Sequence, residues 1–135
     1  MAKKNKIKVL LALFPLENHS RGIITVAGML RDAGMEVVML GNELPERTIE
    51  TAIQEDADVV GISTYCGGEL ALSTDLLKAA AKKGIKEHTV FVLGGIFPPR
   101  NLAKLLKLGF SGVFPPSSTR EEIVACIEQA VAARG

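Results

Sequence analysis

The feature that most constrains the fold of this chain is a strict alternation of short apolar runs with longer segments of helical periodicity, repeated five times. The first apolar run covers residues 7–14 and has the length and β-branched content of a buried strand. The next segment, residues 22–33, has apolar residues at helical spacing, namely Ile23, Val26, Ala27 and Leu30. Such alternation predicts a parallel sheet with helices on both faces.

The same alternation continues to the end of the chain. Four further apolar runs predict strands over residues 36–40, 59–63, 89–93 and 112–114. A helix is predicted after each of them, beginning near residues 45, 69, 99 and 119. Five strands joined by helical crossovers predict an α/β fold of the flavodoxin-like (Rossmann-like), doubly wound type with strand order 2-1-3-4-5.

Local signals predict where some helices begin and which side chains they bury. Pro45 fixes the first backbone angle of the second helix, and Ile53 is expected on that helix's inward face. Thr119 and Glu122 have the spacing of a capping box at the start of the last helix. Cys126 is expected in the core beneath that helix.

Length and composition predict one globular domain over residues 1–135, with residues 1–6 as a basic tail. The chain has 135 residues, 47% of them apolar and 23% charged, with a formal net charge of +1. So small a charge gives no case for nucleic-acid or membrane binding, and no segment approaches the ~20 apolar residues of a membrane span. Cys66 and Cys126 are widely spaced and form no C-x-x-C pair, which predicts a reduced, cytoplasmic setting.

The predicted strand order brings two loops to one crevice. The sheet changes direction between the first and third strands, so residues 17–22 and 63–68 are expected at the same carboxyl edge. His19 lies in the first of these loops, and Glu17 precedes it by two residues. Histidine is a common metal ligand, and a carboxylate on its second nitrogen fixes the tautomer and raises its basicity.

Other chemistry-bearing residues follow strands at the same edge. Ser63 ends the third strand, Gly94 and Gly95 follow the fourth, and residues 115–118 follow the fifth. A glycine pair directly after a strand lets a ligand or another backbone come close, or simply makes a tight turn. The Ser63 hydroxyl can bind a ligand or cap the strand end. Both readings stay open from the residues alone.

Two other users of this fold lack the residues they need here. A phosphoacceptor receiver domain requires an aspartate at the end of the third strand and a lysine at the end of the fifth, where this chain has Ser63 and Phe114. Residues 17–22 are not the hydroxyl- and glycine-rich phosphate loop of a flavodoxin. The chain also has no G-x-G-x-x-G fingerprint for a dinucleotide.

Three segments at three strand ends resemble the cobalamin-binding domain of the methylmalonyl-CoA mutase family. That family carries D-x-H-x-x-G after the first strand, where this chain has E-N-H-S-R-G over residues 17–22. The family's S-x-L corresponds to S-T-Y over residues 63–65. Its G-G, followed shortly by proline, is matched by G-G-I-F-P-P over residues 94–99. The resemblance covers nearly the whole chain.

The resemblance implies a cofactor and a set of contact residues. The cofactor would be adenosylcobalamin, bound base-off with His19 as the lower axial ligand of cobalt and with Ser63 as hydrogen-bond partner to the base of the nucleotide tail. The full set implied to contact the cofactor is Glu17, Asn18, His19, Ser20, Arg21, Gly22, Ser63, Tyr65, Gly67, Gly94, Gly95, Ser117 and Ser118.

The resemblance also implies a partner and a division of labour. Cobalt–carbon homolysis would start a carbon-skeleton rearrangement of an acyl-CoA held by a separate, large TIM-barrel mutase subunit. No catalytic residue is expected on this chain alone, which would be inactive without that subunit. A homodimer is compatible with the sequence.

The departures from the family pattern leave a second function open. Glu17 replaces the family's aspartate, Tyr65 replaces a leucine, and residues 115–118 lack the glycines that the family places after the fifth strand. The alternative to a mutase small subunit is a cobalamin carrier or sensor, or a divergent interaction module with weakened or lost cofactor binding.

The remaining ionisable and thiol groups are given structural interpretations. Asp56 and Asp58 precede the third strand and are expected in a solvated loop, and His88 is expected at the surface. Cys66, close to the predicted tail site, is expected to be a small buried thiol, not a reactive one.

Overall fold

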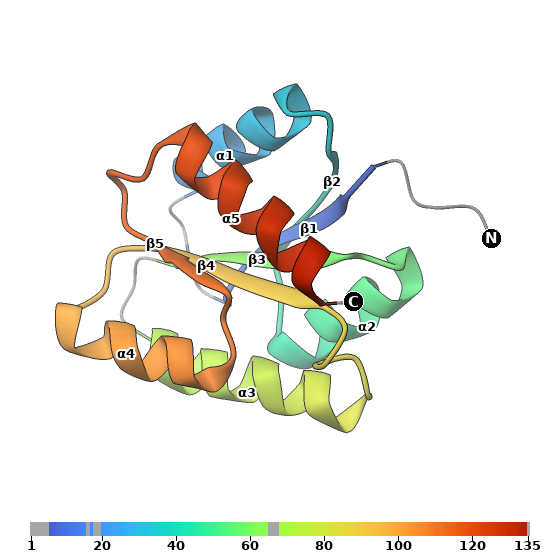
Figure 1. Cartoon of the computed structure of the whole chain (residues 1–135). Helices are drawn as coiled ribbons and strands as arrows, with labels where there is room; N and C mark the ends of the chain where they lie inside the picture. Colours follow the sequence, from blue (N-terminus) through green and yellow to red (C-terminus); the bar gives the residue numbers. More distant parts are fainter. Residues whose placement is uncertain (1–5, 16, 18–19, 65–67, 135) are drawn as a thin grey trace.

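A computed structural model describes residues 6–15, 17, 20–64 and 68–134. Strands and helices alternate along the whole of this chain (Figure 1). The strands are β1 (Lys8–Leu13), β2 (Glu36–Asn42), β3 (Val59–Thr64), β4 (Val90–Gly95) and β5 (Gly112–Phe114). The helices are α1 (Arg21–Asp32), α2 (Pro45–Glu55), α3 (Glu69–Lys82), α4 (Pro99–Leu108) and α5 (Arg120–Ala133).

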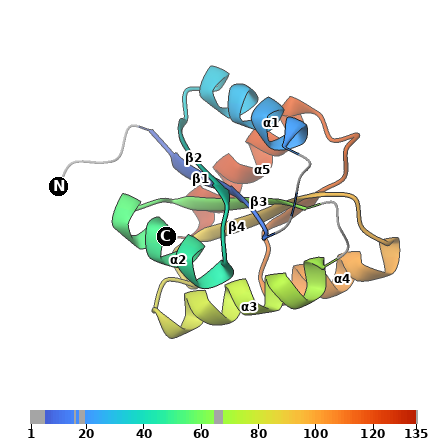
Figure 2. The same ribbon diagram turned by 180° about the vertical axis from the view of Figure 1, so that it is seen from behind.

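The five strands form one parallel sheet in the order β2-β1-β3-β4-β5. The predicted fold class and strand order are therefore confirmed. Helices α1 and α5 cover one face of the sheet, while α2, α3 and α4 cover the other (Figures 1 and 2). Among the described residues, no helix combines the length and the apolar character needed to cross a membrane.

The face covered by α2, α3 and α4 is a closed apolar core. Phe14 and Phe91 are the largest of its almost fully buried side chains. Ile49 from α2, Leu76 from α3 and Leu105 from α4 pack against them with no exposed surface. One side chain from each helix therefore reaches the same core, which holds this layer together.

The other face has a core of its own, which is most tightly buried at the amino ends of the strands. Val9, Val59 and Val90 lie side by side there in adjacent strands, and all three are buried. Leu30 from α1 and Ile127 from α5 belong to the same cluster and are fully or nearly fully buried. The two helices are thus anchored over the amino half of the sheet.

The helix signals expected from the sequence are largely observed. Thr119 accepts from the backbone N–H of Glu122 at 3.1 Å, and the Glu122 carboxylate accepts from the backbone N–H of Thr119 at 2.7 Å, which completes the capping box. Pro45 begins α2 as predicted. The prediction for Ile53 is wrong, because 44% of its surface is exposed. Thr48 takes the inward position in its place.

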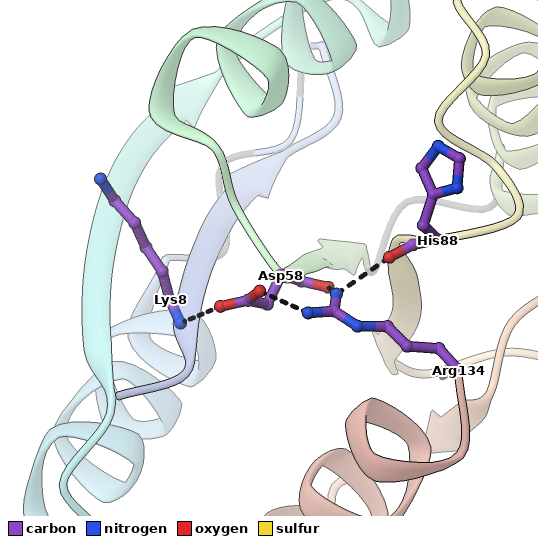
Figure 3. Close-up of polar contacts among 4 residues, drawn as sticks. All are labelled: Lys8, Asp58, His88 and Arg134. Atoms are coloured by element: carbon purple, nitrogen blue, oxygen red, sulfur yellow. Dashed lines mark hydrogen bonds and ion pairs between the residues drawn. The ribbon is translucent and has the colours of Figure 1, made fainter. Parts of the chain in front are cut away.

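Asp58 corrects another expectation, since it is buried and not a solvated loop residue. Its carboxylate accepts from the backbone N–H of Lys8 at 2.9 Å and pairs with the Arg134 guanidinium at 2.5 Å (Figure 3). Arg134 also donates to the backbone oxygens of Asp58 at 3.0 Å and His88 at 2.9 Å. This ion pair ties the end of α5 to the amino ends of β1 and β3. The side chain of His88 is exposed, as expected.

Candidate functional site

A cleft of about 760 Å³ lies between α1 and α5, over the carboxyl halves of the central strands. Its floor is formed by Leu11 on β1, Gly61 and Ser63 on β3, and Val92 and Gly94 on β4. Its helical walls are apolar and are formed chiefly by Ile23, Val26, Met29, Leu30, Ile123 and Ile127. The cleft is therefore an apolar slot that opens at the carboxyl edge of the sheet, where parallel α/β sheets bind ligands.

On β3 and β4, the residues beneath the cleft are smaller at the carboxyl edge of the sheet than at its amino end. Val59 and Val90 are paired near the amino end of β3 and β4. One step further on the same face, Gly61 is paired with Val92, and beyond them Ser63 is paired with Gly94. Two glycines and a serine leave the space between α1 and α5 unfilled. The valines close the slot at its amino end.

Polar groups gather at the mouth of this slot. Ser20 and Arg21 begin α1 and line the cleft, and both are exposed. Ser118 lines it from the segment before α5, next to Pro115 and Pro116. The Ser63 side chain is buried at the boundary between this polar mouth and the apolar interior.

The structure brings together seven of the residues predicted from the sequence. The seven that line the cleft are Ser20, Arg21, Gly22, Ser63, Gly94, Gly95 and Ser118. Glu17 is buried but does not line the cleft, and Ser117 is exposed in the adjacent turn. The other four predicted residues, Asn18, His19, Tyr65 and Gly67, lie outside the described residues.

Gly95 must be glycine because the backbone of the neighbouring strand approaches it closely. Its φ is +146°, and a Cβ built there would lie 1.8 Å from the backbone oxygen of Thr64. No side chain can be accommodated so close to a neighbouring backbone. Gly94 has ordinary space around it, with the Phe114 oxygen 3.7 Å from a built Cβ, so its smallness serves the cleft floor.

Sequence reasoning missed Asn42, which holds the loop after β1. Its amide donates to the backbone oxygens of Phe14 at 3.0 Å and Glu17 at 2.5 Å. The pairing of β1 with β2 shifts register next to Gly41, whose φ is +85°. The sequence signal was the Gly41-Asn42 pair directly after an apolar run, which is typical of a bulge or turn.

A second buried polar group lies on the opposite face of the sheet. Asn101 on α4 donates to the Glu69 carboxylate on α3 at 2.7 Å, and both side chains are buried. The other Glu69 oxygen and the hydroxyls of Thr64 and Ser73 are buried and have no hydrogen-bond partner among the described residues. None of these residues lines the cleft, so they belong to the packing of α3 and α4 and not to the site.

Cys126 lies on α5 and is half-buried, so its predicted core position is only partly correct. Its thiol lies 3.6 Å from the backbone oxygen of Ser111. Burial raises the pKa of this thiol above its ordinary value, which lowers its thiolate fraction at neutral pH. Cys66 lies outside the described residues.

Comparisons with known proteins place this site in a family. A model of the B12 binding domain matches residues 7–125. The 2-hydroxyisobutanoyl-CoA mutase small subunit of Aquincola tertiaricarbonis is 39% identical over 130 residues, which cover 96% of this chain and 95% of that protein. The pivalyl-CoA mutase small subunit of Xanthobacter autotrophicus is 38% identical, covering 90% of this chain and 81% of that protein.

A solved structure supports the same fold. A cobalamin-binding protein from Desulfitobacterium hafniense superposes with a TM-score of 0.78 over 93% of this chain and 59% of that one. Its sequence identity is 19%, so this likeness concerns the fold alone.

This chain belongs to the B12-binding domain family, as the motifs at the strand ends predicted. Over nearly its whole length it is similar to the small subunits of two acyl-CoA mutases.

Proposed function

We propose that this chain binds adenosylcobalamin as the small subunit of an acyl-CoA mutase, with His19 as the lower ligand of cobalt. The observation that carries the proposal is the cleft at the carboxyl edge of the sheet. Segments from three separate strand ends of the family pattern, represented by Gly22, Ser63 and Gly94, line this one cleft. The family match and the two small-subunit relatives support the same assignment.

The residues of the cleft fit the displaced nucleotide tail of the cofactor. An aromatic base would find apolar walls from α1 and α5 and a floor of small residues, which together exclude water. The Ser63 hydroxyl stands where the apolar interior begins and would hydrogen-bond to a ring nitrogen of the base. Ser20 and Ser118 at the mouth would meet the sugar and phosphate of the tail.

The loop after β1 would present the metal ligand. His19 follows Glu17 in the chain, and Asn42 fixes the backbone of Glu17 to the end of β2. A buried carboxylate so close in sequence would orient the imidazole and raise its basicity. Adenosylcobalamin, when bound, supplies the radical for a carbon-skeleton rearrangement, while this chain supplies ligation, orientation and enclosure.

The partner would be a large, barrel-shaped subunit that binds the acyl-CoA over the same carboxyl edge. That subunit would shape the acyl-group specificity, because the cleft on this chain serves the cofactor tail. The proposal therefore predicts isomerase activity only when the two subunits are combined.

The test is an absorption spectrum of the purified chain mixed with adenosylcobalamin, compared with that of the His19→Ala variant. We expect a base-off, histidine-ligated spectrum that the variant loses, while His88→Ala, which changes an exposed histidine, keeps it. The measurement is repeated with the large subunit present, since the partner can complete the site. Absence of histidine-ligated cofactor under both conditions would overturn the ligation.

A further inference from the structure

We infer that Gly61 sets how deeply the lower base of a cobamide enters the cleft, and that the apolar walls around it restrict this chain to cobamides with an apolar, benzimidazole-type base. The inference rests on the proposed function, because it takes the cleft as the site of the nucleotide tail. Gly61 is not among the residues that the sequence motifs assign to the cofactor.

The backbone of β3 does not require glycine at this position. Gly61 lies within the central strand, paired with Leu11 on one side and Val92 on the other, and its φ is not positive. Glycine weakens a strand interior, so its presence here needs another reason. A Cβ built on Gly61 would lie 2.7 Å from Leu11 Cδ2 and 3.3 Å from Val92 Cγ2. Glycine at this position therefore lets the Leu11 and Val92 side chains pack against the β3 backbone, and all three residues line the cleft.

A side chain at position 61 would have to displace Leu11 or project into the cleft, so this position limits the length of the cleft. Ser63 stands two residues nearer the carboxyl edge, about 7 Å along the strand from Gly61. Val59, two residues the other way, belongs to the valine row that closes the slot. A side chain larger than hydrogen at position 61 would therefore move the closed end of the cleft from the valine row toward Ser63.

Among the described residues, the lining of the cleft around Gly61 is apolar. The side chains of Leu11 and Val92 lie nearest to this position, and Leu30, Ile123 and Ile127 line the same cleft from the helices. The backbone of β3 is engaged in pairing with β1 and β4. A purine base would leave its exocyclic amino group and extra ring nitrogens without hydrogen bonds there, whereas a benzimidazole carries no such groups. Burying an unpaired polar group weakens binding by about tenfold or more.

The test measures binding of three corrinoids by equilibrium dialysis. The probes are cobalamin, the corresponding cobamide with adenine as lower base, and cobinamide, which lacks the nucleotide tail. The proteins are the wild-type chain, Gly61→Ala, Gly61→Val and the control Gly28→Ala, whose added methyl meets nothing within 4 Å on the exposed surface of α1. Thermal unfolding by circular dichroism checks that each variant is folded.

We expect the wild type to bind cobalamin at least about tenfold more tightly than the adenine cobamide. Gly61→Val should lose at least about tenfold in cobalamin affinity, Gly61→Ala less, and both should keep wild-type affinity for cobinamide. Gly28→Ala should behave as the wild type with every probe.

Two results would overturn the inference while leaving the proposed function intact. One is equal binding of the two cobamides by the wild type, and the other is unchanged cobalamin binding by a folded position-61 variant. If Gly61→Val does not fold, Gly61→Ala and the wild-type comparison decide. Failure of the wild type to bind any of the three probes, even with its large subunit, would instead overturn the proposed function itself.

Discussion

The two ends of the layer formed by α1 and α5 differ although the same helices and strands build both. At the amino end, valines from β1, β3 and β4 fill the space beneath the helices, and Arg134, directly after α5, pairs with the buried Asp58. At the carboxyl end, Gly61, Ser63 and Gly94 leave a cleft of about 760 Å³. One end thus anchors the layer and the other end stays open.

The comparison indicates that the cleft forms where β3 and β4 carry small side chains beneath the helices. Helices α1 and α5 are fixed by the amino end, so they cannot collapse onto the small residues at the carboxyl end. A cavity between packed elements persists only when the surrounding structure cannot relax into it. The cleft at the carboxyl end therefore depends on the stability of the amino end.

Breaking the ion pair at the amino end should have the largest effect. Arg134→Met keeps an aliphatic stem but removes the guanidinium partner of the buried Asp58 carboxylate. Because the arginine is partly exposed, we expect a loss of about 3 kcal/mol in the free energy of unfolding, measured by urea denaturation. Arg31→Met, on the exposed last turn of α1, should change it by less than about 0.5 kcal/mol. Equal effects of the two substitutions would contradict the role given to this pair.

Truncating matched positions on β3 should sharpen the contrast between the two ends. Val59→Ala removes fully buried methyl groups from the closed row and should cost about 2 kcal/mol, including the cavity it leaves. Ser63→Ala, at the floor of the open cleft, should change the free energy of unfolding by less than about 0.5 kcal/mol. The same denaturation assay measures both. A larger loss in the free energy of unfolding for Ser63→Ala would show that the floor of the cleft contributes to the stability of the fold.

Removing the cap of α5 should loosen the edge of the cleft with a smaller cost. Thr119→Ala deletes the hydroxyl that accepts from the Glu122 N–H, and we expect a loss of about 1 kcal/mol. Thr119→Ser keeps the acceptor and should restore most of it. Hydrogen exchange of the first amides of α5 should speed up in the alanine variant. Unchanged exchange there would argue against local fraying.

The smallest effect concerns pH at the amino end of the sheet. Glu55 accepts from the Lys8 ammonium at 3.0 Å, and this bond, with a weaker contribution from Glu36, raises the pKa of Lys8 above 10.5. A raised pKa in the folded state stabilises the fold below the unfolded pKa, and this contribution is lost as pH rises through the folded pKa. Lys8→Met should therefore reduce the fall in stability as the pH rises above the ordinary lysine pKa, measured by thermal unfolding. An identical pH profile in the variant would exclude a folded-state contribution from this group.

Much of the carboxyl end of the sheet could be predicted from residues that are neighbours in the chain. The periodicity of the apolar runs predicted the strand order, and the motif residues Ser63, Gly94 and Gly95 were expected at one edge because parallel strands end together. The cleft walls could not be predicted in the same way. Which side chains of α1 and α5 meet over β3 depends on register and on the rotation of each helix, and neither is a local property.

The fold, the edge of the sheet at which the site lies and the family could all be predicted from the sequence, since each depends on local periodicity and on short motifs. Three features are visible only in the packed structure: Gly61 lines the cleft, Asn42 binds the backbone of Phe14 and Glu17, and Asp58 is buried. The physical reason is sequence separation. Asp58 and Arg134 lie 76 positions apart, and side chains so distant along the chain become partners only once the packed layers bring them into contact.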